Sequence, residues 1–155
     1  MNYFFTNLIV RLRAICWNFA DEGKFGHNYK EYEGMGQVAV NHLLETKSGQ
    51  VRGAFFRYDT GPIDIVWGEI FDLVRHTGYG IAHILDKHGK SAVDAIGNII
   101  KNGTLKDASN GKLKIVNGKM TLILTRTYSG KDRKIVISCF DKNPEAKAKK
   151  KNPIR

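Results

Sequence analysis

Cysteine is scarce in this sequence, and its scarcity excludes several classes of protein. Only two cysteines occur among 155 residues. Both lie among apolar neighbours, so we expect no disulfide framework. No spacing of cysteine and histidine fits a structural zinc site. The sequence thus indicates a reducing, cytoplasmic compartment, and we expect neither a metal ion nor a cofactor.

Long apolar runs and the common nucleotide-binding motifs are also missing. No apolar run approaches the roughly 18 residues that a membrane span requires, so we expect a soluble protein. Arg11 and Arg13 interrupt the N-terminal stretch, which therefore lacks the apolar centre of a signal peptide. Walker, dinucleotide-binding and HExxH patterns are absent. The run GIAH at 80–83 does not form a nucleophile elbow around a serine.

Acidic residues are too few to balance the basic ones. The chain has 25 Lys and Arg against 15 Asp and Glu, which gives a net charge of +10. Residues 142–155 hold six basic residues and one acidic residue, whereas residues 1–141 hold 19 and 14. This excess favours a polyanion such as RNA as partner, although a basic tail can also be only a solvated segment. No RNP, KH or zinc-finger motif marks a dedicated binding module.

The spacing of apolar residues divides the chain into three parts. Residues 1–20 have helical spacing and predict an amphipathic helix. Its apolar face would pack on this domain, on a neighbouring domain or copy, or, as the less favoured alternative, on a membrane surface. Residues 21–141 form the predicted folded domain. Residues 142–155 have no periodicity and predict a disordered basic tail.

Within the domain, helical and alternating patterns succeed one another. The predicted elements are a helix at about 36–47, a hairpin of strands 51–58 and 62–67, a loop at 68–80, a helix from Gly80 that stops at Gly89, a helix capped by Ser91 that ends at Asn102-Gly103, and a C-terminal meander. Asn110-Gly111 and Asn117-Gly118 are typical hairpin turns of that meander. Helices that are separated from an antiparallel sheet indicate an α+β fold, with the helices packed on a twisted sheet.

Two strands of the meander alternate along their length. On the strand at 119–128, one side is predicted to carry Met120, Leu122, Leu124, Arg126 and Tyr128. On the strand at 133–140, one side is predicted to carry Ile135, Ile137 and Cys139, and the other Val136, Ser138 and Phe140.

The helix GIAHILDKH carries two histidines on different sides. His88 falls on the apolar stripe, whereas His83 is turned away from it and shares a face with Lys87. Either His83 is an ordinary surface or supporting histidine, or it transfers protons near neutral pH. His88 could instead hydrogen-bond the last carbonyls of its own helix.

Three blocks of sequence carry a resemblance to a known family. They are KSGQVRGAFF at 47–56, GPIDIVWG at 61–68 and GIAHILDKHG at 80–89. Together they resemble the endoribonuclease-type domain of polyvalent proteins of phages and mobile elements. Those domains belong to the barnase/EndoU/colicin/RelE-like (BECR) superfamily. The resemblance extends from about Gly23 to the strand IVISCF at 135–140.

The resemblance implies a toxin-like, metal-independent endoribonuclease of barnase/EndoU-like fold. Such an enzyme cleaves RNA by attack of the 2′-hydroxyl on the adjacent phosphate, which requires a base, an acid and groups that stabilise negative charge. Its target would be RNA, with tRNA as one candidate, and an immunity or antitoxin protein is a candidate partner. The alternatives are an inactive, nuclease-derived RNA-binding module and a phage-associated interaction protein. The oligomeric state stays open.

The resemblance also implies roles for individual residues. The catalytic candidates are His83 as base or acid, Arg126 as phosphate clamp, Ser138 as an orienting hydroxyl and Lys87 as a further phosphate contact. The substrate-binding candidates are Arg57, Asp64, Trp67 and Tyr128. His76 in the 68–80 segment is a candidate for the second proton carrier. We expect the three principal residues to converge in one cleft within about 10 Å.

These residues also have structural interpretations. Arg126 could flank a sheet edge, and Ser138 could be a satisfied core hydroxyl. Trp67 could belong to the core, and Asp64 could brace a neighbouring loop.

Overall fold

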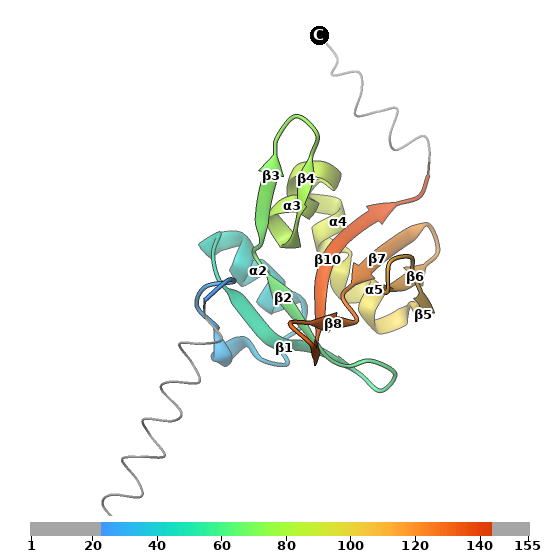
Figure 1. Cartoon of the computed structure of the whole chain (residues 1–155), viewed down its shortest axis with the longest axis horizontal. Coiled ribbons are helices and arrows are strands. Elements are labelled where there is room, and N and C mark those ends of the chain that lie inside the picture. The colour runs from blue at the N-terminus through green and yellow to red at the C-terminus, as the bar shows by residue number, and fades with distance from the viewer. Residues whose placement is uncertain (1–22, 144–155) are drawn as a thin grey trace, which may run out of the picture.

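The computed structural model describes residues 23–143, so the predicted N-terminal helix and the predicted tail beyond Asn143 lie outside the described residues (Figure 1). The helices are η1 (Lys30–Tyr32), α2 (Gln37–Thr46), α3 (Gly80–His88), α4 (Lys90–Asp94) and α5 (Ile96–Asn102). The strands are β1 (Gln50–Arg57), β2 (Gly61–Val66), β3 (Glu69–Asp72), β4 (Thr77–Tyr79), β5 (Thr104–Asp107), β6 (Leu113–Asn117), β7 (Met120–Leu124), β8 (Thr127–Tyr128), β9 (Lys131–Asp132) and β10 (Lys134–Asp141). Within residues 23–143, no helix combines the length and apolar character needed to cross a membrane.

The main sheet confirms the predicted α+β fold. Its strand order is β1-β2-β10-β7-β6-β5, and its neighbours are antiparallel with one exception. β2 and β10 run parallel and pair only at Lys134 with Ile63 and at Ile135 with Asp64. The expectation of a purely antiparallel sheet is therefore wrong at this contact. Local patterns could not reveal it, because the two strands are about seventy residues apart and pair over so short a length.

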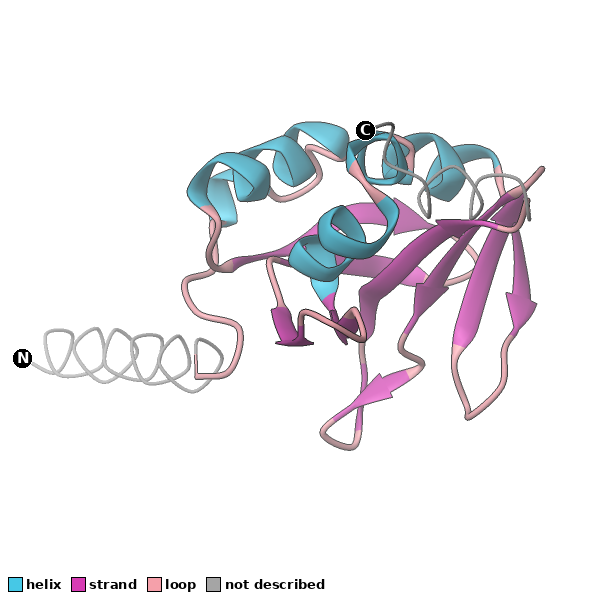
Figure 2. Ribbon diagram, turned by 90° about the horizontal axis from the view of Figure 1, so that it is seen from above, coloured by secondary structure: helices cyan, strands magenta, loops and turns pink. Residues whose placement is uncertain are grey.

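Helices α2, α4 and α5 cover one face of the sheet and enclose the core (Figure 2). The largest fully buried side chains there include Leu43, Ile63, Ile65, Ile81, Ile84, Ile96, Ile99, Ile115, Leu122 and Leu124. A smaller cluster lies on the opposite face of the sheet and contains Phe25, Val66 and Ile135 with Tyr79 and Tyr128. Alternation explains the two clusters, since Ile65 and Val66 are successive strand residues and point to opposite faces. We call the face opposite α2, α4 and α5 the outer face.

The structure confirms the helix predicted at about 36–47, the hairpin predicted from strands 51–58 and 62–67, and the helix end predicted at Gly89. The predicted cap at Ser91 is wrong. α4 begins at Lys90 directly after Gly89, and Ala95 separates it from α5. Neither N-cap residue caps its helix with its own side chain. Instead, Gln37 of α2 accepts the N–H of Gly97 at 2.9 Å and donates to the carbonyl of Val93 at 3.2 Å, and the buried residues Val93 and Ile96 hold the two helices on the core.

The predicted loop at 68–80 is a second hairpin, so that prediction is wrong. β3 and β4 pair antiparallel and project beside α3 (Figure 1). The carboxylate of Asp72 holds the turn by accepting the backbone N–H groups of Val74 and Arg75 at 2.8 and 3.1 Å. The segment has neither an Asn-Gly turn nor a clean alternation, which is why its local pattern did not predict strands.

The strict alternation predicted for the last strand is also wrong. A bulge lies between Val136 and Ser138, so Val136 and Cys139 both point into the core. Ser138 and Phe140 pair with Ile123 and Thr121 and point to the outer face.

The preceding strand is shorter than predicted. β7 ends at Leu124, and Tyr128 belongs to a separate two-stranded ribbon, β8–β9. Arg126 therefore lies between strands and not on the alternating face that the sequence predicts.

The junction between β2 and α3 fixes where the helix begins. Gly68 and Gly80 have φ values of +79° and +81°, and their backbones lie in contact. A Cβ atom on Gly68 would lie 2.0 Å from the carbonyl oxygen of Tyr79, so only glycine fits. The N–H of Ala82 donates to the carbonyl of Trp67 at 2.8 Å and ties the first turn of α3 to the end of β2.

Candidate active site

Helix α3 brings the histidine of the third block beside the sheet. β2 and β10 pair over only two residues, and α3 packs against both strands and against the β3–β4 hairpin. Ile81 and Ile84 bury the helix's apolar stripe in the core. His83 lies off that stripe, as its spacing predicts.

His83 is unusually placed for a histidine off the apolar stripe of its helix. It is only 6% exposed, and its Nδ1 atom is buried without a hydrogen-bond partner. An unpartnered buried nitrogen costs free energy, and catalytic groups are among the residues for which proteins retain such a cost. Burial lowers the pKa of His83 below its ordinary value, and the positive charge of Lys87 lowers it further. The imidazole is therefore neutral at pH 7 and can accept a proton.

A second histidine is held next to the same helix. The Nδ1 atom of His76 lies 2.7 Å from a carboxylate oxygen of Asp86, and His76 is about half exposed. Because a carboxylate only accepts, Nδ1 carries the hydrogen and Nε2 faces outward from this pair. The backbone of His76 has a φ of +51°, a left-handed conformation that is uncommon outside glycine. His76 and Asp86 both contribute to the electrostatic field at His83.

The charges around His83 make a testable prediction about its titration. Lys87→Met removes a positive charge that opposes protonation, so the pKa of His83 should rise. Asp86→Asn removes a negative charge that favours protonation, so the pKa should fall. An NMR titration of the His83 ring measures both shifts. Lys90→Met is the matched control, because its ammonium group pairs with Asp94 and should leave the His83 titration unchanged. Shifts of the same sign in the Lys87 and Asp86 variants would contradict this electrostatic account.

A ring contact connects this helix with the outer face of β10. The rings of His83 and His88 are 6.0 Å apart, and the ring of His88 is 5.8 Å from that of Phe140. Ser138 lies two residues before Phe140 and points to the same face. Ser138 is half-buried. The structure thus places Ser138 on the strand against which α3 packs.

Arg126 lies outside this group of residues around α3. Its guanidinium donates to Asp107 at 2.5 Å and lines a cavity of about 600 Å³ with Lys106, Thr127 and Lys134. Arg126 immediately precedes β8, which lies at the lower end of the molecule in Figure 1, whereas α3 lies in its upper part. Within residues 23–143, no described contact joins Arg126 to His83, so the structure places these two predicted residues in separate groups.

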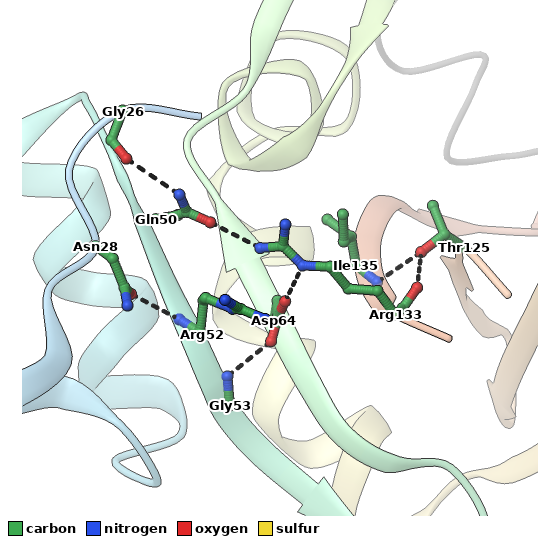
Figure 3. Close-up of polar contacts among 9 residues, drawn as sticks. All are labelled: Gly26, Asn28, Gln50, Arg52, Gly53, Asp64, Thr125, Arg133 and Ile135. Carbon is green, nitrogen blue, oxygen red and sulfur yellow. Dashed lines mark hydrogen bonds and ion pairs between the residues drawn. The ribbon is translucent and has the colours of Figure 1, made fainter. Parts of the chain in front are cut away.

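Asp64 belongs to a buried polar network and not to an open surface (Figure 3). One of its carboxylate oxygens accepts the N–H of Gly53 at 2.7 Å, and the other accepts Nε of Arg133 at 2.5 Å. The side chains of Asp64 and Arg133 are 7% and 11% exposed. Gln50 accepts a second guanidinium hydrogen at 2.7 Å and donates to the carbonyl of Gly26 at 3.1 Å. The network therefore joins β1, β2 and the start of β10 to the segment that precedes η1.

The other predicted substrate-binding residues are engaged within the fold. Arg57 donates to the carbonyls of Ile100 and Gly103 at the end of α5. It also pairs with Asp59, and this hydrogen-bonded pair raises the pKa of Arg57. Trp67 packs against the main core. Tyr128 packs on Phe25, with ring centroids 5.1 Å apart.

An aromatic set lies over Arg133 on the outer face. The guanidinium carbon is 5.4 Å from the ring centre of Phe25 and 5.7 Å from that of Tyr128, and the ammonium of Lys24 lies 5.5 Å from that of Tyr79. Such cation–π contacts contribute most where the cation is shielded from water, as Arg133 is.

Asp86 and Arg133 are not among the residues that the sequence predicts for the site. Asp86 could have been found, because it lies three residues after His83 and thus near the same face of one helix. Arg133 has no such signal, since its partner Asp64 is 69 positions away. Among residues 23–143, no three histidine, cysteine, aspartate or glutamate side chains are grouped as metal ligands would be.

A comparison with family models decides the relationship. Residues 54–146 match the model described as phage-Barnase-EndoU-ColicinE5/D-RelE like nuclease 1. The chain belongs to this nuclease family. The match covers more than half of the chain and confirms the resemblance seen in the sequence. No curated protein and no solved structure matches this BECR-type chain. The family model includes α3 and β10, so His83 and Ser138 lie within the nuclease domain.

Proposed function

We propose that this BECR-type nuclease is a metal-independent endoribonuclease whose proton transfers are made by His83 and His76. The observation that carries the proposal is the placement of the buried His83 imidazole on the same helix as Asp86, whose carboxylate orients the ring of a second histidine, His76. The lowered pKa of His83 supports it. Within a nuclease family, a neutral imidazole and a second, oriented imidazole match the base and the acid that RNA transesterification requires.

In the proposed reaction, His83 takes the proton of the RNA 2′-hydroxyl while the 2′-oxygen attacks the adjacent phosphorus. The bond from phosphorus to the 5′-oxygen breaks, and His76, which must enter this step protonated on both ring nitrogens, gives its Nε2 proton to that oxygen while Nδ1–H stays bonded to Asp86. The products are a 2′,3′-cyclic phosphate and a 5′-hydroxyl, so atoms and protons balance. Lys87 would stabilise the added negative charge of the transition state, and the hydroxyl of Ser138 would donate to a phosphate oxygen.

Arg126 has a different place in this proposal. Because it lies near β8 and pairs with Asp107, it would bind a phosphate farther along the strand and not the scissile one. An incoming phosphate would exchange with the carboxylate of Asp107, whose side chain is 85% exposed.

The family and the charge support a proposal for the biological role. The phage-associated family and the excess of basic residues favour a toxin-like effector that acts on RNA such as tRNA, with an immunity or antitoxin protein as partner. We place this activity in the cytoplasm.

The proposed mechanism is tested by comparing a normal RNA substrate with one that lacks the attacking 2′-hydroxyl. The protein is incubated in EDTA with an RNA oligonucleotide, and then with the same oligonucleotide carrying a single 2′-deoxy nucleotide at the cleaved position. We expect cleavage of the first, with 2′,3′-cyclic phosphate ends, and none at the substituted position of the second. Cleavage at the deoxy position, or activity only after Mg²⁺ is added, would overturn the mechanism.

The alternative, an RNA-binding module without turnover, gives a different result in the same experiment. It would bind both oligonucleotides equally, with an affinity that falls as salt is added, and would produce no new ends.

A further inference from the structure

The outer face of the C-terminal strands carries two lysines in an unusual arrangement. Lys106 on β5 and Lys114 on β6 are direct cross-strand partners. Leu105 and Ile115, the preceding and following residues on these strands, pack in or against the core, so both lysine side chains point to the outer face. Like charges directly opposite one another on an antiparallel ladder destabilise the sheet.

Neither lysine is neutralised by the protein. Among residues 23–143, neither ammonium group has a hydrogen bond or an ion pair, whereas Lys90 and Lys134 each pair with an aspartate. The acidic residues that line a cavity with Lys106 pair with other cations: Asp59 with Arg57, Asp107 with Arg126 and Asp132 with Lys134. The two positive charges therefore attract an anion from outside the protein.

The register continues the pair toward the candidate active site. Lys114 is opposite Ile123 on β7, and Ile123 is opposite Ser138 on β10. We call the series Lys106–Lys114–Ile123–Ser138 the lysine row. Neighbouring strands are about 4.8 Å apart, so the row spans roughly 14 Å across the sheet. At its β10 end, Phe140 on the same face contacts His88 of α3.

We infer that the lysine row binds the phosphates of the substrate RNA strand as it leaves the cleavage site across the outer face. This inference rests on the proposed function, because it takes the strand to be cut near His83. The strand would pass Ser138 and the apolar Ile123 and place one phosphate against Lys106 and a second against Lys114. The unpaired lysines indicate that the bound molecule is a polyanion. Because the row continues to β10, the strand would cross the sheet from Ser138 towards Lys106.

The test measures binding of an RNA that cannot be cleaved. A 2′-O-methyl oligoribonucleotide is titrated with the full chain at several salt concentrations, with the double variant Lys106→Gln/Lys114→Gln, and with the matched control Lys112→Gln/Lys119→Gln. The control removes the same charge from exposed positions beside the two Asn-Gly turns. Each phosphate contact to a single strand contributes about 0.7 to the slope of log affinity against log salt, so the row variant should reduce the slope by about 1.4. The control should retain the slope of the unmodified chain.

Strand length gives a second measurement. With cleavable RNA, the row variant should have a higher KM and an unchanged kcat. We expect this difference only for substrates that extend far enough beyond the cleaved phosphodiester bond to cross the sheet. An equal loss of slope in both double variants would show a general charge effect and overturn the row. A lower thermal midpoint of the free row variant would also overturn it, because like charges without a partner should not stabilise the fold.

The two proposals fail in distinguishable ways. If the unmodified chain cleaves RNA but the row variant binds like the unmodified chain, only the lysine row is wrong. If the chain binds the uncleavable RNA through the row but cuts nothing, the proposed function is wrong and the row remains as a binding surface. If the chain does not bind RNA at all, both are wrong.

Discussion

Arg133→Ala should lower the free energy of unfolding by about 3–5 kcal/mol, the range for breaking a buried ion pair. The variant leaves the carboxylate of Asp64 buried without its cation, and it also removes the partner of Gln50. The aromatic rings of Phe25 and Tyr128 lose the guanidinium that lies over both of them. Single domains have stabilities of only about 5–15 kcal/mol, so this loss is a large share. Urea denaturation followed by fluorescence measures it.

Two further variants distinguish the loss of the buried ion pair from the loss of an ordinary arginine side chain. Arg75→Ala removes an arginine whose side chain is 82% exposed and 3.7 Å from Asp72, and should cost less than about 1 kcal/mol. The double variant Asp64→Leu/Arg133→Met removes both charges together and should be more stable than Arg133→Ala alone. If Arg133→Ala costs no more than Arg75→Ala, the network of Figure 3 does not stabilise the fold as we describe.

His83→Ala should lower the rate of RNA cleavage by about 10²–10⁴-fold, the usual contribution of a general acid or base. The fold should persist, because the buried Nδ1 atom that the variant removes has no hydrogen-bond partner. Single-turnover cleavage of a defined oligonucleotide measures the rate, and circular dichroism checks the fold. His27→Ala is the control, since that exposed histidine lies before η1 and away from α3 and should retain activity. Equal rates for the His83 variant and the unmodified chain would exclude His83 as base or acid.

The pH dependence tests the same histidine by a second route. As the general base, His83 must be neutral, so kcat/KM should fall as the pH drops through its lowered pKa, below the ordinary value of 6.5. Lys87→Met should move this acid limb to higher pH, together with the titration of the ring.

The same lowered pKa has a consequence for stability. The folded state binds fewer protons at His83 than the unfolded state does. The contribution of His83 is therefore fully present above the unfolded pKa, and it is lost as the pH falls from there through the folded pKa. In His83→Ala, unfolding free energy should depend less on pH in this window. An unchanged pH dependence would contradict the burial of this imidazole.

Local patterns were enough for the elements whose causes are local. The apolar stripe of α3 and the stop at Gly89 depend on residues within one or two turns. The hairpin of β1 and β2 likewise depends on neighbours in the sequence. For the same reason the position of His83 off that stripe was predictable, because 3.6 residues per turn fixes the side of a helix on which each residue lies.

Long-range contacts explain where those patterns failed. The bulge in β10 depends on how that strand meets β7, and strict alternation does not contain it. The hairpin of β3 and β4 depends on Asp72 and on its packing beside α3. Asp64 was a substrate-binding candidate on its motif, yet its environment is set by Arg133, which approaches only when β10 lies parallel to β2.

The sequence alone determined the α+β class, the membership in a nuclease family and the excess of positive charge, because each depends on residue types and on spacings within short segments. Only the tertiary structure decided which predicted residues are neighbours. It separated Arg126 from α3, buried Asp64 and brought Lys106 opposite Lys114. These outcomes depend on strand register and on the way α3 packs beside β10, and such contacts are set by the burial of apolar side chains from distant parts of the chain.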